Sequence, residues 1–240
     1  SMPQAFRSTL LSLRDLLLSA GPLAFLAVGL LALAYWWLNP TPPHQVTLAT
    51  GPAQSAYEAF GMRYQKALAA EGIEVVLVPS EGSSANLQLL RDGRADLAFV
   101  QGGTAELQPS DQEDLQSLGS LFVEPLWLFY RTQGTPRLRK TDRLDTLPQL
   151  RGLRVNVGTA GSGVPTLMEK LLDANRMKPS DLKLSQLGQT EATVRFLAGK
   201  LDVLVFASAP EPLMVQMLLQ TPGVQLMDFA QNEAYGRRFP

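Results

Sequence analysis

An uncharged and mostly apolar stretch at residues 16–38 constrains the fold of this 240-residue chain more than any other feature. About 20 residues of this kind cross the hydrocarbon core of a bilayer as a helix. Aromatic residues at 35–37 end the stretch, where such rings favour the headgroup level, and Arg7 and Arg14 precede it, where positive charge favours the cytoplasm. We therefore predict a cytoplasmic segment at 1–15, a transmembrane helix at 16–38, and a soluble domain in the periplasm, anchored to the inner membrane.

Two alternatives compete with an uncleaved anchor. A cleaved signal peptide has a shorter apolar core followed by a small-x-small site, whereas Asn-Pro-Thr-Pro-Pro follows here at 39–43. A buried core helix is rarely so long and so uniformly apolar. The anchor is the interpretation that we carry forward, with the proline-rich residues 39–45 as a stiff linker.

Composition narrows the chemistry that the soluble part can perform. The formal net charge is −1, so nothing in the charge balance indicates a nucleic-acid partner. There is no cysteine, and His44, in the linker, is the only histidine. Most catalytic triads and most histidine or thiolate metal sites therefore lack a residue that they need. We expect no catalytic residues, no metal site and no cofactor, and a protein that is not an enzyme.

Strand and helix patterns alternate beyond the linker. The first series predicts strands at 46–50, 73–78 and 96–100, helices at 55–70 and 85–91, and an extended apolar segment at 118–130. The second predicts strands at 154–158, 182–186, 203–206 and 224–227, with helices at 164–175, 190–199 and 211–219. Such alternation predicts right-handed βαβ units and parallel sheets. The expected fold class is α/β and two-lobed, with lobe one at 46–125 and lobe two at 126–228.

Small-residue turns follow several of these strands, at the carboxyl ends where open α/β sheets bind ligands. Between two lobes such turns face a cleft, which is a common position for a ligand site. Helix N-termini at the turns offer unpaired N–H groups to an anion, and glycine allows its close approach. The residues that we predict to contact a ligand are Gly51, Ser55, Tyr57, Gly82, Ser83, Asn86, Gln101, Gly161, Ser162 and Gly163.

Plainer roles compete at several of these positions. Ser162 either caps the helix that follows or donates to an anion. Tyr57 is either an aromatic residue lining the cleft or a core residue. The loop after the third strand, which contains Gln101, either places an amide at the cleft or is an ordinary glycine-containing turn.

A weak internal repeat links the two series. At 92–99 and again at 198–206, a glycine, a basic residue and an aspartate precede an apolar strand. We interpret Asp96 and Asp202 as turn residues of two related lobes rather than as catalytic acids.

Several short motifs, taken in order, cover about residues 46–210. They are Leu48-Ala-Thr-Gly51, Tyr57, Gly82-Ser83 with Asn86-Leu87, Gly93 with Asp96-Leu97-Ala98, Gln101-Gly102, Leu118-Gly-Ser-Leu121 with Glu124-Pro125, and Val157-Gly158 with Gly161-Ser162-Gly163. In these motifs the chain resembles the solute-binding subunits of TAXI-type TRAP transporters, which have the type II periplasmic-binding-protein fold. The resemblance implies capture of small carboxylates or amino acids for Na⁺-coupled importers, with TRAP-type membrane subunits as partners.

The chain departs from that family in two ways. Soluble members have a cleaved signal, so an uncleaved anchor resembles the membrane-tethered, TAXI-like branch. The family's fold also returns from lobe two to complete lobe one, and residues 229–240 supply only the start of such a return. We therefore expect the C-terminal return to be missing and the chain to be a fragment of a longer protein.

The function that follows is a membrane-anchored solute-binding protein that captures a small anionic or zwitterionic solute, such as a short carboxylate or an amino acid, for uptake. Arg131 is the charged residue best placed to assist, and a solvated hinge arginine is the alternative for it. A ligand-sensing or assembly protein that kept the fold without transport is the competing hypothesis, because a tether limits movement between solute and transporter. An enzyme on the same scaffold is the third.

Overall fold

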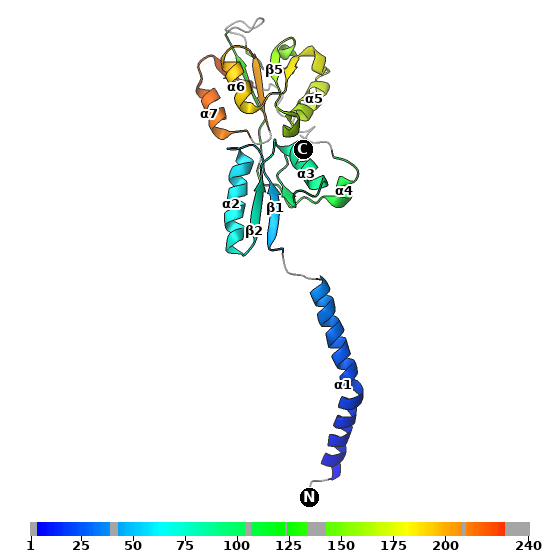
Figure 1. Cartoon of the computed structure of the whole chain (residues 1–240). Coiled ribbons are helices and arrows are strands. Elements are labelled where there is room, and N and C mark those ends of the chain that lie inside the picture. Colours follow the sequence, from blue (N-terminus) through cyan, green and yellow to red (C-terminus); the bar gives the residue numbers. More distant parts are fainter. Residues whose placement is uncertain are drawn as a thin grey trace. The chain divides into compact units, whose positions relative to one another are not determined.

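The computed structural model of the protein describes residues 4–38, 43–103, 107–122, 124–133, 143–207 and 210–228, with side chains from residue 12 onward. The predicted linker residues 39–42 and return segment 229–240 lie outside these ranges. The chain forms two compact units, residues 1–43 and residues 44–240 (Figure 1).

The first unit is a single helix, α1 (Gln4–Leu38). Its part from Ser12 to Leu38 spans 27 residues with a mean hydropathy of 2.3, which is long and apolar enough to cross a membrane. A signal sequence has the same properties, so the helix fits both the predicted anchor and its first alternative. The helix also begins within the predicted N-terminal segment 1–15 and runs through position 16 without a break. The side chain of Arg7 lies outside the described part.

Lobe one of the second unit contains a parallel three-stranded sheet. Its elements are β1 (Gln45–Ala49), α2 (Ala56–Ala70), β2 (Glu74–Val78), α3 (Ser83–Arg91), β3 (Leu97–Ala98) and α4 (Asp111–Asp114). The strand order is β2-β1-β3, and both pairings are parallel, as the sequence predicts for βαβ units. The short helix α4 has no counterpart among the predicted elements.

Apolar residues at helical and strand spacing hold lobe one together. Tyr57 of α2 packs with Leu48 of β1, Val75 of β2 and Phe99, which directly follows β3, and all four are buried. The helix starts where it does because the side chain of Ser55 accepts a hydrogen bond from the N–H of Glu58. This core fixes the carboxyl ends of β1 and β2 side by side.

Lobe two contains a five-stranded sheet in the order β6-β5-β7-β4-β8. Its strands are β4 (Trp127–Arg131), β5 (Arg154–Asn156), β6 (Lys183–Ser185), β7 (Val203–Phe206) and β8 (Val224–Leu226). Its helices are α5 (Val164–Ala174), α6 (Gln189–Leu197) and α7 (Pro212–Gln220), with 3₁₀ turns η1 (Leu147–Leu150), η2 (Ala160–Ser162) and η3 (Pro179–Asp181). Figure 1 shows α5, α6 and α7 in this lobe and α2 and α3 in lobe one.

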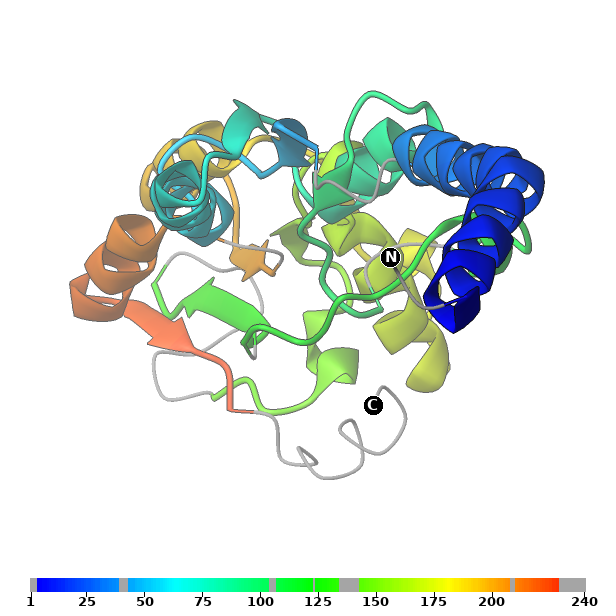
Figure 2. The same cartoon turned by 90° about the horizontal axis from the view of Figure 1, so that it is seen from below.

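The expectation of purely parallel sheets is wrong for lobe two. Strand β4 runs antiparallel to both β7 and β8, while β5 is parallel to β6 and β7. The reason is that β4 enters directly from the extended segment leaving lobe one, with no helix before it. A strand that enters without a crossover helix has no need to run with its neighbours. Figure 2, seen from below, shows β8 beside β4 at this end of the sheet.

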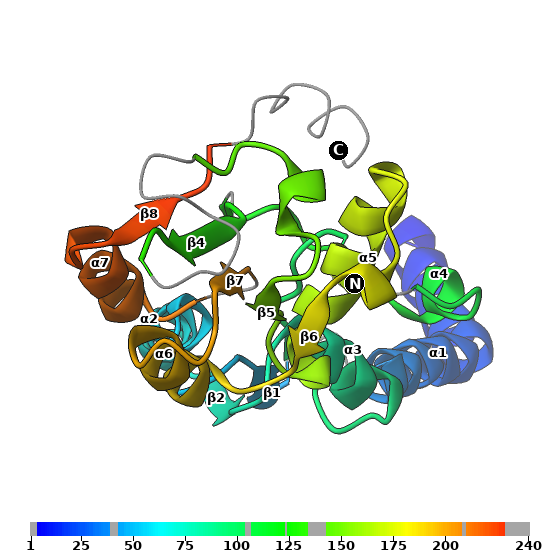
Figure 3. The ribbon, with the colours of Figure 1, turned by 90° about the horizontal axis from the view of Figure 1, so that it is seen from above.

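Alternating side chains put helices on both faces of the lobe-two sheet. Leu128 of β4 and Val203 of β7 pack toward residues of α5, whereas Phe129 and Leu204, the next residue in each strand, pack with residues of α6 and α7. Figure 3 shows α5 on one side of the strands and α6 and α7 on the other. Because both faces are covered, β7 is buried throughout, and its carboxyl end opens toward lobe one.

Candidate ligand-binding cavity

A cavity of about 340 Å³ lies between the two lobes of the second unit. The loops after β1 and β2 line it from lobe one, and the loops after β5, β6 and β7 line it from lobe two. These positions are the carboxyl ends of parallel strands, where a ligand is expected in α/β sheets. The lining residues are Pro52, Ala53, Ser80, Glu81, Asn156, Gly158, Thr159, Ser162, Val164, Gly188, Gln189, Thr190, Val205, Phe206, Ala207 and Glu211.

A buried asparagine organises the lobe-one side of the cavity. The side-chain amide of Asn86 donates to the carbonyl oxygens of Thr50, at 2.5 Å, and Phe99, at 2.8 Å. Its Oδ1 accepts from the hydroxyl of Ser80 at 2.6 Å. The N–H of Ser80 in turn donates to the carbonyl of Gly51 at 3.2 Å. One amide therefore ties together the loops that follow all three strands of lobe one.

A second buried asparagine does the same in lobe two. Oδ1 of Asn156, at the end of β5, accepts from the hydroxyl of Ser185 at 3.0 Å and from the N–H of Leu187 at 2.8 Å. Its Nδ2 donates to the carbonyl of Leu187 at 3.2 Å. The side chain thereby holds the β6–α6 loop against the end of β5 and places Gly188 and Gln189 at the cavity.

The turn at 161–163 is built by its own residues and by one residue of lobe one. The hydroxyl of Ser162 donates to the carbonyl of Thr159 at 2.6 Å and accepts from the N–H of Val164 at 3.2 Å. The N–H of Gly161 donates to Oε2 of Glu81, in the β2–α3 loop, at 3.1 Å. A Cβ on residue 161 would collide with that carboxylate and lie 2.8 Å from the Cβ of Glu81. Glycine is therefore required for this close approach.

Further contacts lie at and near the junction of the lobes. The ammonium of Lys170 on α5 donates to the carbonyl of Gly103 in lobe one at 3.1 Å. The hydroxyl of Tyr57 donates to Oε2 of Glu124, in the segment that leads into lobe two, at 2.7 Å, and the side chain of Gln101 donates to the carbonyl of Glu124 at 3.2 Å. The Lys170–Gly103 and Gly161–Glu81 bonds therefore join the two lobes, whereas the two bonds to Glu124 lie within lobe one, at its end.

The charges at the cavity have one sign among the described residues. Glu81 from lobe one and Glu211 from lobe two line it, and no lysine or arginine does. Glu211 is positioned through its backbone N–H, which donates to Oε1 of Gln189 at 3.1 Å. The remaining wall is mixed, with apolar residues such as Val164, Val205 and Phe206 and uncharged polar residues such as Ser80 and Thr159.

The N-terminus of α6 also faces the cavity. Its N-cap is Gly188, which provides no side-chain hydrogen bond to the first turn, and Gly188, Gln189 and Thr190 all line the cavity. The backbone N–H groups at a helix start lack partners within the helix and carry a partial positive charge. This helix start is one electropositive feature of the described cavity wall, to which the start of α5, at Val164, and that of α7, whose N-cap is Glu211, also contribute.

The model of the NMT1-like family matches residues 48–236, which includes both lobes and the whole cavity. The chain belongs to the NMT1-like family. Structural comparison places this NMT1-like chain among solute-binding folds at low sequence identity, where likeness shows the fold alone.

Three solved structures illustrate that fold. A substrate-binding protein of an ABC uptake transporter from Streptococcus pneumoniae, with bound histidine, is 12% identical with a TM-score of 0.52, covering 78% of this chain and 75% of that one. The alkanesulfonate-binding protein SsuA from Xanthomonas axonopodis pv. citri, bound to MOPS, is 17% identical with a TM-score of 0.50, covering 80% and 63%. The regulatory domain of CcmR from Synechocystis PCC6803, in complex with 2-PG, is 16% identical with a TM-score of 0.50, covering 78% and 81%.

These likenesses confirm the predicted two-lobed α/β fold of periplasmic binding proteins. The NMT1-like chain spans 59% of the length of the aliphatic sulphonate-binding protein SsuA from Escherichia coli, and 63% of the length of SsuA from Xanthomonas axonopodis pv. citri. These findings support the binding-protein fold in general. They do not single out the TAXI or TRAP family that the sequence resembles.

Among the residues that the sequence predicts as ligand contacts, Ser162 lines the cavity, and the others are not among its lining residues. The hydroxyl of Ser162 accepts from the N–H of Val164, the first residue of α5, although the N-cap itself is Gly163, and Tyr57 lies in the core of lobe one. Their direct contact with a ligand stays a prediction. The others occupy loop and helix-start positions: Gly51 beside Ser55 and Tyr57, Gly82 as N-cap of α3, Ser83 accepting from the N–H of Gln101, Asn86 bridging the strand ends, and Gly161 and Gly163 flanking Ser162.

Fifteen of the sixteen lining residues were not predicted as ligand contacts from the sequence, among them Glu81, Asn156, Gln189 and Glu211. Glu81 and Gln189 stand next to recognised turns, but side chains beside a turn point either way. Asn156 lies inside a strand, and Glu211 was assigned to the start of a helix, so neither carried a signal of its own. Among the described residues no group of three or more histidine or acidic side chains could hold a metal ion.

Proposed function

We propose that this NMT1-like chain binds one small polar solute in the cavity between its lobes. The observation that carries the proposal is that loops from both lobes line one cavity at the carboxyl ends of their strands, joined across it by the bond between Glu81 and Gly161. The volume of about 340 Å³ lies near the lower end of ligand pockets and suits a molecule of amino-acid size. Such a protein captures a ligand and performs no chemistry on it.

A zwitterion fits the described wall better than a simple anion. The first turn of α6 can receive a carboxylate, but the carboxylates of Glu81 and Glu211 oppose a ligand that carries negative charge alone. Arg131, the predicted charged helper, is not among the residues that line the cavity. Among the predicted ligands, we favour an amino acid over a short carboxylate.

The tether suggests how the captured solute is used. We propose that α1 is an uncleaved anchor that keeps the binding domain at the periplasmic face of the inner membrane. The resemblance to TAXI-type subunits suggests delivery of the solute to TRAP-type membrane subunits. A ligand sensor is the alternative, and the same fold in the CcmR regulatory domain shows that it also serves regulation in another protein.

A cavity-filling substitution tests the binding site. Thr190 lines the cavity from the exposed start of α6, and Val194 is exposed one turn later on the same helix, outside the lining. Thr190→Trp should abolish the rise in thermal midpoint that amino acids produce in the full chain in detergent, and Val194→Trp should keep it. Equal ligand-induced shifts in the wild type and Thr190→Trp would contradict the site.

Uptake measurements separate transport from sensing. Cells that lack this protein should lose uptake of the bound solute and regain it with the wild type but not with Thr190→Trp. Unchanged uptake, together with intact binding in vitro, would favour the sensor.

A further inference from the structure

We infer that the ligand carries a positively charged nitrogen, an ammonium or a related cation, which is held between Glu81 and Glu211. This inference rests on the proposed function and names the chemical class of the solute. It goes beyond the predicted small anion or zwitterion, because it makes the positive group of the ligand, rather than a carboxylate, the feature that the cavity recognises.

No ion pair within the described residues balances the negative charge at the cavity. The ion pairs of the described residues join Arg91 to Asp111, Arg151 to Asp181, Arg154 to Asp202 and Arg195 to Glu191. Neither Glu81 nor Glu211 takes part in any of them. Glu81 is exposed and Glu211 is half-buried, and no lysine or arginine is among the described lining residues, so a ligand that displaces water from these carboxylates has to compensate their charge. A cation does so, and an anion makes the imbalance worse.

Groups of the chain itself already bind the turn at 161–163. Glycine-rich turns of this kind are typical anion sites, since their N–H groups point outward. Here the N–H of Gly161 donates to the carboxylate of Glu81, and the hydroxyl of Ser162 donates to the carbonyl of Thr159. The chain's own carboxylate thus occupies a position that a ligand's carboxylate would need.

The two glutamates line the cavity from different lobes. Glu81 belongs to lobe one and is fixed by its bond to Gly161 of lobe two. Glu211 belongs to lobe two, and its backbone is fixed by Gln189 at the start of α6. A fixed acceptor such as the Glu81 carboxylate loses little conformational entropy when a ligand binds, which favours recognition of a charged donor. An ammonium has three N–H donors and can engage both carboxylates together.

Matched probes test the inference by charge alone. The full chain in detergent is titrated, by thermal shift and then calorimetry, with unbranched carboxylates, amines and amino acids of two to six carbons. Compounds that carry an ammonium should bind, and the carboxylates that lack nitrogen should not. Binding of a carboxylate without nitrogen would overturn the inference while supporting the proposed function.

Isosteric variants test the two acceptors. Glu81→Gln keeps an oxygen for the N–H of Gly161 and removes only the charge, and Glu211→Gln does the same across the cavity. Each should weaken the best amine-bearing compound by about tenfold or more, the usual effect of losing a hydrogen bond to a charged group. Glu169→Gln, an exposed position on α5 outside the cavity, is the matched control and should bind like the wild type.

Two further outcomes would contradict the inference. Unchanged affinity in both Glu81→Gln and Glu211→Gln would overturn the inference even if amines bind. Silence of every compound, anion and amine alike, would contradict the proposed function and the inference with it. A thermal midpoint for each variant without ligand, close to that of the wild type, shows that the variants are folded.

Discussion

The two lobes enter their third βαβ strand through the same local device and surround it differently. In lobe one Asp96 donates its N–H to the carbonyl of Thr47 at 2.9 Å and accepts the N–H of Thr47 on its carboxylate at 2.8 Å. In lobe two Asp202 makes the same pair of bonds with Arg154, at 2.9 and 2.8 Å. The weak repeat in the sequence therefore corresponds to a shared structural role, and neither aspartate faces the cavity.

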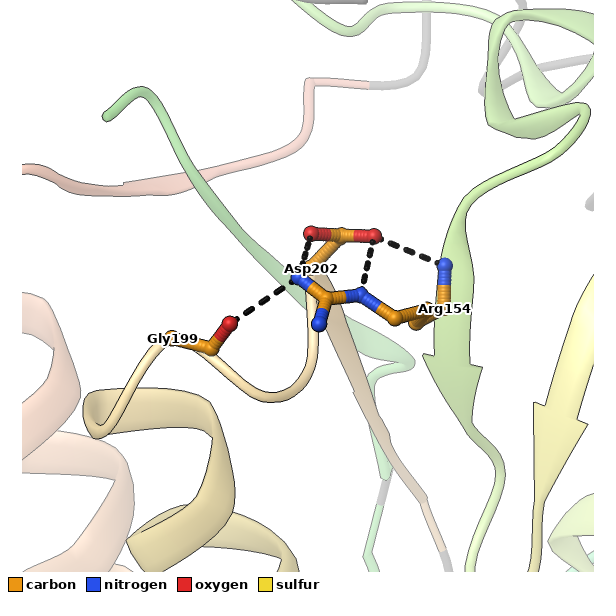
Figure 4. A network of polar contacts seen from close by, with 3 residues as sticks. All are labelled: Arg154, Gly199 and Asp202. Atoms are coloured by element: carbon orange, nitrogen blue, oxygen red, sulfur yellow. Dashed lines mark hydrogen bonds and ion pairs between the residues drawn. The ribbon is translucent and has the colours of Figure 1, made fainter. Parts of the chain in front are cut away.

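The surroundings differ because the strands occupy different places in their sheets. Strand β3 is an edge strand, so Asp96 is exposed, whereas β7 lies between β5 and β4, so Asp202 is buried. The guanidinium of Arg154 compensates the buried charge of Asp202. It donates hydrogen bonds of 2.7 and 3.1 Å to the carboxylate and one of 2.9 Å to the carbonyl of Gly199 (Figure 4). These hydrogen bonds to Asp202 raise the pKa of Arg154 above its ordinary value. The aspartate therefore aligns two strands in both lobes and, among the described residues, only in lobe two is it also part of an ion pair.

Removing the two carboxylates should show the largest difference in stability between the lobes. Asp202→Ala leaves Arg154 without its carboxylate partner. The side chain of Arg154 is 36% exposed, so water can solvate the guanidinium in part. We therefore expect the free energy of unfolding to fall by about 2–3 kcal/mol, toward or below the low end for broken buried pairs. Asp96→Ala removes one hydrogen bond at the surface and should cost about 1 kcal/mol.

The check is denaturant unfolding of the full chain in detergent, followed by circular dichroism. Asn replacements at the same positions keep the shape and serve as controls. Equal losses for Asp202→Ala and Asp96→Ala would show that the burial of the lobe-two pair has no energetic consequence.

The glycines of the repeat should show a smaller difference. Gly93 and Gly199 both have positive φ, +66° and +78°, so alanine at either position costs about 1–2 kcal/mol. A Cβ on Gly93 meets nothing within 4 Å, whereas one on Gly199 would lie 2.6 Å from Nη1 of Arg131. Gly199→Ala should therefore be the more destabilising variant, because Arg131 must also move. A Gly93→Ala variant as unstable as Gly199→Ala, measured by the same unfolding assay, would contradict that account.

The smallest expected effect is on stability at low pH. In lobe one it depends on another ion pair, which stops contributing when its carboxylate is protonated. Arg91 on α3 forms a short bond of 2.6 Å to Asp111 of α4, which is buried. Bonds from Arg91 and from the N–H of Gln108 lower the pKa of Asp111 from 3.8 to about 2. Since the folded pKa is below the unfolded one, this contribution is complete above pH of about 4 and disappears as the pH falls toward 2.

Asp111→Asn removes the titrating group and provides the test. The thermal midpoint of the wild type should fall more steeply between pH 5 and pH 2.5 than that of the variant. Parallel curves for the two proteins would show that Asp111 titrates alike in the folded and unfolded states.

Much of the fold was predictable because it depends on local pattern. The periodicity of apolar residues located β1, α2, β2, α5 and β7 to within a residue or two. The direction of β4 was not predictable, because its pairing with β7 and β8 is set by contacts distant in sequence. Helix α4 was missed because four polar residues carry no periodicity.

The cavity was predictable in position but less so in its chemistry. Gly161 marked a close approach of backbone, and the structure shows that the approaching group is Glu81 of the chain itself. Whether a small polar residue faces a ligand or braces a loop depends on which hydrogen bonds the tertiary fold offers it. Asn86 illustrates this, since its amide is used by Thr50 and Phe99, two residues that the fold brings together.

The most direct test of the central claim is native mass spectrometry of the full chain extracted from its host membrane. We predict one small molecule bearing an amino group, bound to each wild-type chain and to Val194→Trp, and absent from Thr190→Trp. A small molecule retained equally by Thr190→Trp, or a wild-type chain that remains empty and binds no small solute added to saturation, would contradict a solute-binding role for the cavity.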